Sequence, residues 1–154
     1  MKLNLPMDVS EVQIFLDSLP YDYETAEKNY SVSSPIRVLE KRKAMCLDGA
    51  LLGAYLLKKP PIIVYLLNEK TAHVVLLTKK NNKFGSVAKS RHKDYLGRPP
   101  IFNSVKELAK SYEGFNRYGL ADISVIYPDW QKFNRKDIDW QKVFPYGLTS
   151  LLDL

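Results

Sequence analysis

The sequence predicts an α+β protein in which N-terminal helices pack on a mainly antiparallel sheet. Three segments with helical spacing of apolar residues come first along the chain. Strand-like segments rich in β-branched residues follow them, and two of these are joined by a tight turn. Because the helices precede the strands, we expect them on one side of the sheet. With 154 residues and no repeat or linker, the chain is expected to form one domain, residues 1–154.

The first two helices carry recognisable start signals. The first is expected over residues 8–19, where Asp8 stands three residues before Glu11, the spacing of a capping box. The second is short and begins with Ser34 as its N-cap and Pro35 at the first helical position. Both segments therefore predict helix starts from local chemistry alone.

The third helix contains the single cysteine of the chain. It is expected to begin at or near Cys46, after a basic run, and to continue to Leu57 before a pair of prolines. Gly49 and Gly53 lie inside it, and each costs about 1 kcal/mol relative to alanine in a helix interior. Close packing against another element is the reason we expect for them, so this helix should be central.

Three strands are expected after this helix. Residues 62–67, "IIVYLL", are apolar on both faces and suit a buried strand. Residues 72–78 and 84–90 form a hairpin, because Asn81 and Asn82 tolerate the left-handed conformation of a two-residue turn. In that register the numbers of paired residues sum to 163.

The last expected helix covers residues 104–112, with Ser104 as its N-cap and Glu107 reaching back to it. Beyond it, aromatic and charged residues alternate around two prolines, and we predict only that the aromatic side chains pack over the core.

Composition limits the functional classes. The formal net charge is +6, which favours acidic partners through long-range attraction. A single cysteine cannot form an internal disulfide, and the N-terminus lacks a signal sequence, so a cytoplasmic location is expected. The longest apolar runs fall far short of the ~20 residues that cross a bilayer, which predicts no membrane span. The basic residues are spread along the chain without a known nucleic-acid-binding motif, so nucleic-acid binding is disfavoured.

Cys46 is the candidate nucleophile. A cysteine in the first turn of a helix lies close to unpaired backbone N–H groups, which favour the thiolate over the thiol. Only His73 and His92 could act as its base, and His73 begins a strand expected beside the one that follows the helix. The alternatives are a buried, inert Cys46, a buried structural His73 and a solvated His92. No cofactor is expected, and the spacing of cysteine and histidine does not fit a metal site.

Charged residues flank the cysteine in sequence. Asp48 follows it closely, and Lys41, Arg42 and Lys43 precede it. Such charges at a helix start usually form a solvated edge, although cations there would favour the thiolate and an acidic substrate.

The segments "SPIRVLEKRKAMCLDGALLGAYLL", "PPIIVYLL", "HVVLL", "KFGSVAKS" and "RPPIFNSVKELAKSY" resemble the transglutaminase-like branch of the papain-like cysteine enzyme fold. The similarity is greatest to small bacterial proteins of that superfamily without assigned substrates. The resemblance spans residues 12–112. It implies that Cys46 attacks an amide or thioester carbonyl with His73 as general base, giving an acyl-enzyme that water or an amine resolves.

The third catalytic position departs from the superfamily pattern. An Asp or Asn usually orients the histidine there, but this chain has Ala88 near that place. From the hairpin register, Ser90 is opposite His73 and is the first candidate to accept its hydrogen bond, with Ser86 next. Asp94 could also fold back from the loop.

An oxyanion hole is expected from the Cys46 backbone N–H and one upstream side chain. Three tyrosines are candidates and nothing in the sequence selects among them: Tyr21, Tyr23 and Tyr30.

The resulting hypothesis is a cysteine-dependent acyltransferase or amide-bond hydrolase with a catalytic Cys46, His73 and Ser90 and without cofactor or metal. Its partner would be a protein, a peptide or a small amide, with a preference for acidic ones. The alternatives are a non-catalytic binding protein of the same fold and a basic protein associated with nucleic acid.

Overall fold

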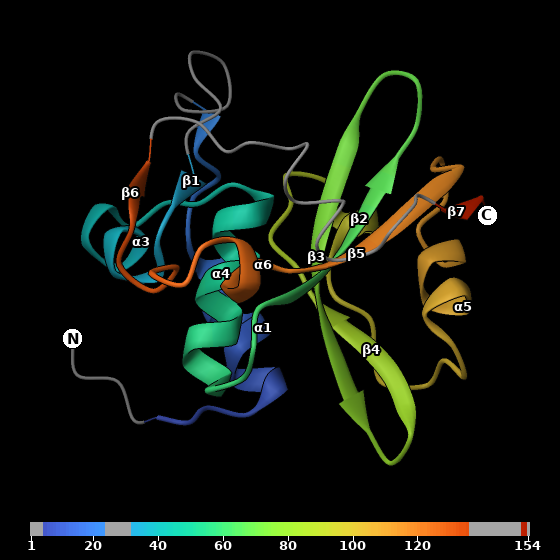
Figure 1. Ribbon diagram of the computed structural model, residues 1–154, viewed down its shortest axis with the longest axis horizontal. Coiled ribbons are helices and arrows are strands. Elements are labelled where there is room, and N and C mark those ends of the chain that lie inside the picture. The colour runs from blue at the N-terminus through green and yellow to red at the C-terminus, as the bar shows by residue number, and fades with distance from the viewer. Residues whose placement is uncertain (1–4, 24–31, 136–151, 154) are drawn as a thin grey trace.

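An antiparallel five-stranded sheet lies at the centre of the molecule (Figure 1), and the segments predicted as strands form three of its strands. The structure is a computed structural model that describes residues 5–23, 32–135 and 152–153. The strand order is β4-β3-β2-β5-β7. The strands are β2 (Ile62–Leu67), β3 (Ala72–Lys80), β4 (Lys83–Val87), β5 (Arg117–Asp122) and β7 (Leu152–Asp153). The fold is therefore α+β with a mainly antiparallel sheet, as the sequence predicts.

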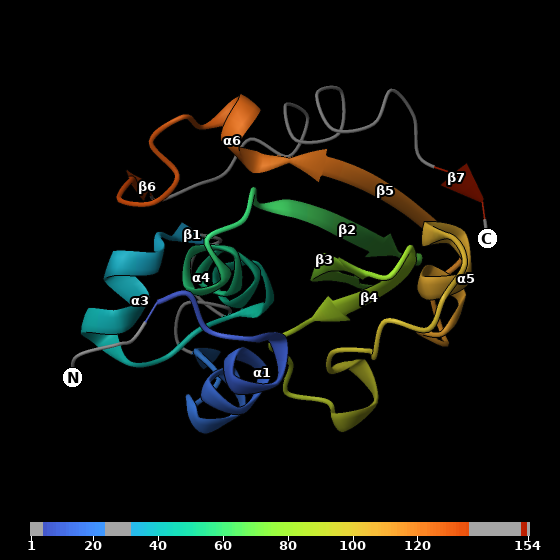
Figure 2. The same cartoon turned by 90° about the horizontal axis from the view of Figure 1, so that it is seen from below.

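The N-terminal helices cover one face of this sheet (Figure 1). They are α1 (Val9–Ser18), α3 (Pro35–Lys41) and α4 (Cys46–Leu57). Their buried residues form one apolar cluster with Val74 and Leu76 of β3. A two-stranded sheet of β1 (Val32–Ser33) and β6 (Asn134–Arg135) and the short α6 (Ile123–Ile126) complete this side. Helix α4 lies among the other helices in both views (Figures 1 and 2), which agrees with its apolar composition.

The other face of the sheet is also covered, which corrects the expectation that all helices lie on one side. Helix α5 (Val105–Lys110) lies at the opposite side of the sheet from α4 (Figure 2). Leu108 and Ala109 of α5 form a second apolar cluster with Val64 and Val75. Alternate residues of each central strand thus serve different clusters, as the period of two in a strand requires.

The predicted helix starts are confirmed. The Asp8 carboxylate accepts a hydrogen bond from the Glu11 N–H at 2.8 Å, and Glu11 Oε1 accepts one from the Asp8 N–H at 3.1 Å. Ser34 Oγ accepts from the Arg37 N–H at 3.4 Å, and Ser104 Oγ accepts from the Glu107 N–H at 3.1 Å. The Glu107 carboxylate reaches the Asn103 N–H at 2.9 Å rather than that of Ser104, one residue beyond the expected partner.

The hairpin is formed in the predicted register. Asn81 and Asn82 have φ angles of 53° and 61°, the left-handed conformation of a two-residue turn that matches the twist of the strands. Lys80 pairs with Lys83, and Leu76 pairs with Val87, so paired residue numbers sum to 163. The pairing ends at Val87, three residues before the predicted end of this strand.

Strand β5 was not expected from its sequence, "RYGLAD". It pairs with all of β2, from Ile62↔Asp122 to Leu67↔Arg117, and lies between β2 and the two-residue β7. Glycine and aspartate are depleted in strands, so its local propensity is poor. Backbone hydrogen bonds to β2 and β7 stabilise the strand, although its side chains do not favour one.

No helix within the described parts of the chain is both long and apolar enough to cross a membrane.

Candidate functional site

Cys46 is the first residue of α4, as the sequence predicts. Met45 is the N-cap, with extended backbone, and the cysteine is a free, half-buried thiol packed against the first apolar cluster. The backbone N–H of Val74 faces the sulfur and favours its thiolate form. Val74 follows His73 in β3, at the level where β4 has already left the sheet. The thiol therefore lies beside the start of β3.

The pKa of Cys46 departs from the expectation for a helix start. Burial is the main cause and raises the pKa of the thiol above its ordinary value, and the Asp48 carboxylate raises it further. The N–H groups of Val74, Leu47 and Cys46 act in the opposite direction without reversing the shift. Cys46 is thus a neutral thiol at pH 7, and any attack on a carbonyl requires a base that removes its proton.

Asp48 is buried, which corrects the expectation of a solvated charged edge. Its two carboxylate oxygens accept hydrogen bonds from the N–H groups of Ser33 at 2.8 Å and Met45 at 3.2 Å. Lys41 Nζ lies 3.7 Å from Asp48 and 2.7 Å from the buried Asp22. Burial raises the pKa of Asp48, while these donors and the Lys41 ammonium oppose the rise. This buried ionic cluster anchors the first turn of α4 to β1 and α3.

Tyr21 is the candidate oxyanion donor whose hydroxyl interacts electrostatically with Cys46. Its backbone pairs with Ala44, two residues before Cys46. Burial, then the charge of Cys46, raises the pKa of Tyr21 to about 12, so its hydroxyl stays protonated and can donate. Tyr23 is half exposed and its ring lies 5.0 Å from that of Tyr21. Tyr30 lies outside the described residues.

An arginine covers the two tyrosines. The guanidinium carbon of Arg91 lies 5.8 Å from the ring centroid of Tyr21 and 6.0 Å from that of Tyr23. We call Tyr21, Tyr23 and Arg91 the tyrosine–arginine cluster. Because Arg91 is exposed, its charge is available to an anion that approaches Cys46 from solvent.

His73 is the second residue of β3 and is 5% exposed. Its ring lies among the aromatic side chains of the second cluster, 5.7 Å from Tyr112 and 6.4 Å from Phe115 between centroids. Burial lowers the pKa of His73 to about 4, and the nearby charges of Arg98 and His92 contribute. The imidazole is therefore neutral at physiological pH.

The hydrogen bond of His73 defines its tautomer. Nε2 lies 2.7 Å from the backbone oxygen of Tyr95. A carbonyl oxygen only accepts, so Nε2 carries the proton in the neutral ring and Nδ1 keeps the basic lone pair. The Tyr95 carbonyl thus orients the imidazole as an acidic or amide side chain does in cysteine enzymes. Every residue has a backbone carbonyl, so the sequence could not identify Tyr95 as the acceptor for His73.

Neither serine accepts the hydrogen bond of His73 that the sequence assigned to them. The β3–β4 pairing stops before it reaches Ser90, and Ser90 Oγ instead accepts from the His92 N–H at 2.9 Å. Ser86 Oγ lies 2.6 Å from the Tyr112 hydroxyl. The register was predicted correctly, but β4 leaves the sheet too early to use it at this position.

Cys46 and His73 approach one another only through the backbone. The described residues show no hydrogen bond between the thiol and either ring nitrogen, and the His73 ring packs in the second cluster while Cys46 packs against the first. The Val74 N–H is the link between them. The catalytic pair therefore stays a prediction, and so does a catalytic role for Ser90.

Gly49 allows the segment after β4 to approach the first turn of α4. A Cβ atom at Gly49 would lie 2.3 Å from Lys89 Cβ, closer than two carbon atoms can approach. Lys89 itself is buried, and its ammonium donates to the carbonyl of Leu16 at 3.0 Å and also to that of Leu19, at the end of α1. This contact explains why a helix interior carries a glycine here.

We expect Gly49→Ala to lower the free energy of unfolding by about 2 kcal/mol, because Lys89 cannot move without leaving the end of α1. Helix propensity alone predicts the opposite sign, a gain of about 1 kcal/mol. Urea denaturation measures the difference. Gly53→Ala is the matched control, since its Cβ meets the flexible Leu76 Cδ2 at 3.2 Å and should change stability less. A Gly49→Ala protein as stable as wild type contradicts the close contact.

Within the described ranges, no group of three or more His, Cys, Asp or Glu side chains is arranged to hold a metal ion.

Comparison with known proteins gives a partial similarity. No protein-family model matches the chain. Over 76 residues the chain is 29% identical to tubulinyl-Tyr carboxypeptidase 1 of Mus musculus. The matched part is 44% of this chain and 20% of the carboxypeptidase, so the chain spans about a fifth of that protein's length. The chain is thus similar in part to a hydrolase of peptide bonds.

Proposed function

We propose that this protein is a cysteine-dependent peptide hydrolase of papain-like, transglutaminase-like architecture, formed as one domain by residues 1–154. Cys46 is the nucleophile, His73 is the general base, and a C-terminal peptide bond is the target. The observation that carries the proposal is the position of the Cys46 thiol at the first turn of α4, facing the amide that follows His73. The similarity to a carboxypeptidase supports the choice of reaction.

The protonation states favour general-base catalysis over a pre-formed ion pair. The thiol and the imidazole are both neutral at pH 7, because burial raises the pKa of Cys46 and lowers that of His73. His73 Nδ1 is not hydrogen-bonded to the thiol in the described free protein, so the proposed step requires it to reach Cys46 in the substrate complex. It then takes the thiol proton as the sulfur bonds to the carbonyl carbon, and the Tyr95 carbonyl, bound to Nε2–H, stabilises the imidazolium that forms. Such a pair avoids a buried charge in the resting enzyme.

The remaining steps follow from the same residues. The Tyr21 hydroxyl and the Cys46 N–H donate to the developing oxyanion. The C–N bond breaks as the imidazolium returns its proton to the leaving amine, which gives a thioester on Cys46. Water attacks the thioester with His73 again as base, the C–S bond breaks, and the shortened peptide leaves with a new carboxylate.

The tyrosine–arginine cluster supports recognition of a free C-terminus. A carboxypeptidase substrate ends in an α-carboxylate, and a guanidinium binds a carboxylate through two parallel hydrogen bonds. Arg91 is exposed and lies over Tyr21, and Tyr21 is close enough to Cys46 for a thiolate there to raise the pKa of its hydroxyl. An anionic peptide end held by Arg91 therefore lies next to the nucleophile. A reducing compartment keeps a nucleophilic thiol from oxidation, so we propose a cytoplasmic location.

The test uses peptides that end in tyrosine, each as the free acid and as the C-terminal amide. Mass spectrometry should show loss of the last residue from the free acid and none from the amide. Cys46→Ala and His73→Ala should each lower kcat/KM by about 1,000-fold or more, as loss of a nucleophile or its base does. His92→Ala removes the other histidine, which is exposed, and should retain activity. Cleavage that survives in Cys46→Ala contradicts the proposal.

A non-catalytic binding protein is the second candidate, favoured by the raised pKa of Cys46 and by the absence of a thiol–imidazole hydrogen bond among the described residues. In that case iodoacetamide should modify Cys46 only after denaturation, and no peptide should be cleaved. Rapid alkylation of the native protein below pH 8 that depends on His73 contradicts this second candidate.

A further inference from the structure

Arg98 binds the backbone on both sides of Tyr95. Its Nη2 donates to the carbonyl oxygen of Asp94 at 2.6 Å, and its Nη1 donates to that of Leu96 at 2.9 Å. The carbonyl between these two is the one that accepts from His73 Nε2. One guanidinium therefore fixes the peptide units that flank the acceptor of the histidine.

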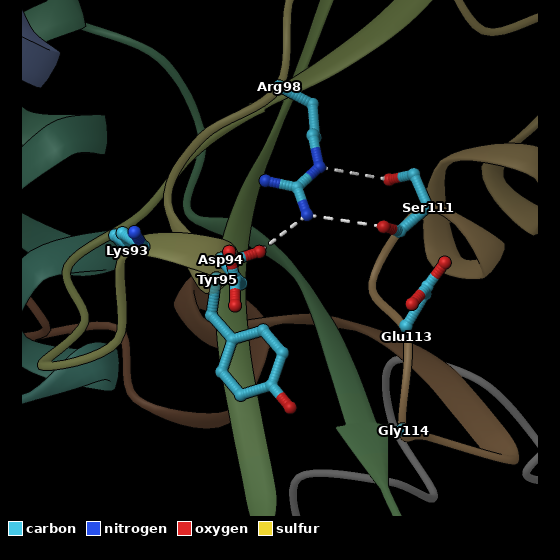
Figure 3. Close-up of a pocket in the computed structure, with 7 residues that line it drawn as sticks. All are labelled: Lys93, Asp94, Tyr95, Arg98, Ser111, Glu113 and Gly114. Atoms are coloured by element: carbon cyan, nitrogen blue, oxygen red, sulfur yellow. Dashed lines mark hydrogen bonds between the residues drawn. The ribbon is translucent and has the colours of Figure 1, made fainter.

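The same side chain ties this loop to the end of α5 (Figure 3). Nε and Nη2 of Arg98 donate to Oγ and to the carbonyl oxygen of Ser111, each at 3.2 Å. The guanidinium carbon lies 4.0 Å from the centroid of the Tyr112 ring, whose hydroxyl donates to the Leu96 carbonyl at 2.8 Å. Arg98 and Tyr112 together thus attach the loop to the C-terminal end of α5.

The loop that contains Tyr95 borders a cavity. A cavity of about 640 Å³ is lined by Lys93, Asp94, Tyr95, Arg98, Ser111, Glu113 and Gly114. Figure 3 shows Arg98 reaching across it to Ser111, with Asp94 and Tyr95 on the other side. The loop is not buried in a core. Backbone hydrogen bonds between Arg98 and Ser86 hold its end, and the Arg98 guanidinium holds the carbonyls on either side of Tyr95.

We propose that Arg98 is a positioning residue that fixes the Tyr95 carbonyl against His73 and so maintains the Nε2–H tautomer with a basic Nδ1. Its value for catalysis rests on the proposed function, whereas its effect on the tautomer does not. Only arginine fits this position, because four N–H donors in one rigid plane meet four acceptors. The single ammonium of lysine cannot span both carbonyls and Ser111.

The tautomer can be measured directly by ¹⁵N NMR of the histidine rings, since the chain has only two histidines. Wild-type protein should show His73 as the Nε2–H tautomer. In Arg98→Lys the Tyr95 carbonyl is no longer fixed, and we expect a mixture of tautomers and faster exchange of the Nε2 proton. Arg37→Lys makes the same change at an exposed position on α3 and should leave the His73 signals unchanged.

A peptide-cleavage assay separates this inference from the proposed function. If both hold, Arg98→Lys lowers kcat by about 10- to 100-fold with KM little changed, as a displaced catalytic group does. A wild-type protein that cleaves peptides while Arg98→Lys keeps the Nε2–H tautomer and full kcat overturns the inference alone. A wild-type protein that cleaves nothing while Arg98→Lys loses the tautomer overturns only the proposed function.

A milder variant covers the case in which Arg98→Lys does not fold. Ser111→Ala removes the hydroxyl acceptor of the guanidinium and leaves its three carbonyl contacts, to Asp94, Leu96 and Ser111, in place. It should fold and give a smaller shift in the tautomer ratio than Arg98→Lys. An unchanged His73 tautomer in Ser111→Ala, with Arg98→Lys unfolded, would show that the tie to α5 has no influence on the histidine and would overturn the inference.

Discussion

Asp48→Ala should lower the free energy of unfolding by about 3–5 kcal/mol, the cost of removing one partner from a buried ion pair. The substitution leaves the N–H groups of Ser33 and Met45 without their acceptor inside the protein. It also removes one of the two carboxylates that neutralise Lys41, leaving Asp22 alone with it. Urea denaturation at pH 7 measures the difference.

Glu11→Ala is the matched control for this change. Glu11 occupies the same third helical position in α1 that Asp48 occupies in α4, and each accepts from the N–H of its N-cap residue. Glu11 is exposed, so its loss should cost about 1 kcal/mol or less. If the two substitutions cost the same, burial of Asp48 contributes nothing beyond capping and the ionic cluster is not what anchors α4.

Asp48 also connects stability to the thiol. Its negative charge raises the pKa of Cys46, so Asp48→Asn should move the pH profile of Cys46 alkylation to lower pH in protein that remains folded. The residue that holds α4 in place therefore also adds to the effect of burial in raising the pKa of the Cys46 thiol.

Local signals in the sequence were sufficient for the elements that carry the site. The start of α4 at Cys46, the N-caps Asp8 and Ser34, and the turn at Asn81 and Asn82 depend on the chemistry of neighbouring residues, and all are present. Each depends on groups only a few residues apart, which are close in space because they are close in sequence.

Contacts between distant residues account for what the sequence did not predict. Lys41 and Asp48 were expected in water because charged side chains usually are, yet Asp22 and two backbone donors let Asp48 be buried. The sequence predicts a side-chain acceptor for His73, whereas in the structure the acceptor is the Tyr95 carbonyl. The pKa of Cys46 was expected to fall at the helix start, but burial of the thiol outweighs the local N–H groups.

His73 should make the protein unstable in acid over a defined range. The pKa of an unfolded histidine is about 6.5, whereas burial holds that of folded His73 at about 4. Between these values the unfolded chain binds the proton and the folded protein does not, so the free energy of unfolding falls as pH decreases. A shift of this size corresponds to a loss on the order of 3 kcal/mol from pH 6.5 to 4.

Comparison with His73→Gln isolates this contribution. Glutamine can donate to the Tyr95 carbonyl but does not titrate, while the opposing contribution of Asp48, whose pKa is raised, is present in both proteins. The stability advantage of wild type should therefore shrink by on the order of 3 kcal/mol between pH 6.5 and 4. His92→Gln removes an exposed ring and should follow wild type. A constant difference between wild type and His73→Gln would mean that folded His73 accepts a proton as readily as the unfolded chain. The imidazole could then not be the neutral, carbonyl-bound base on which the proposed mechanism depends.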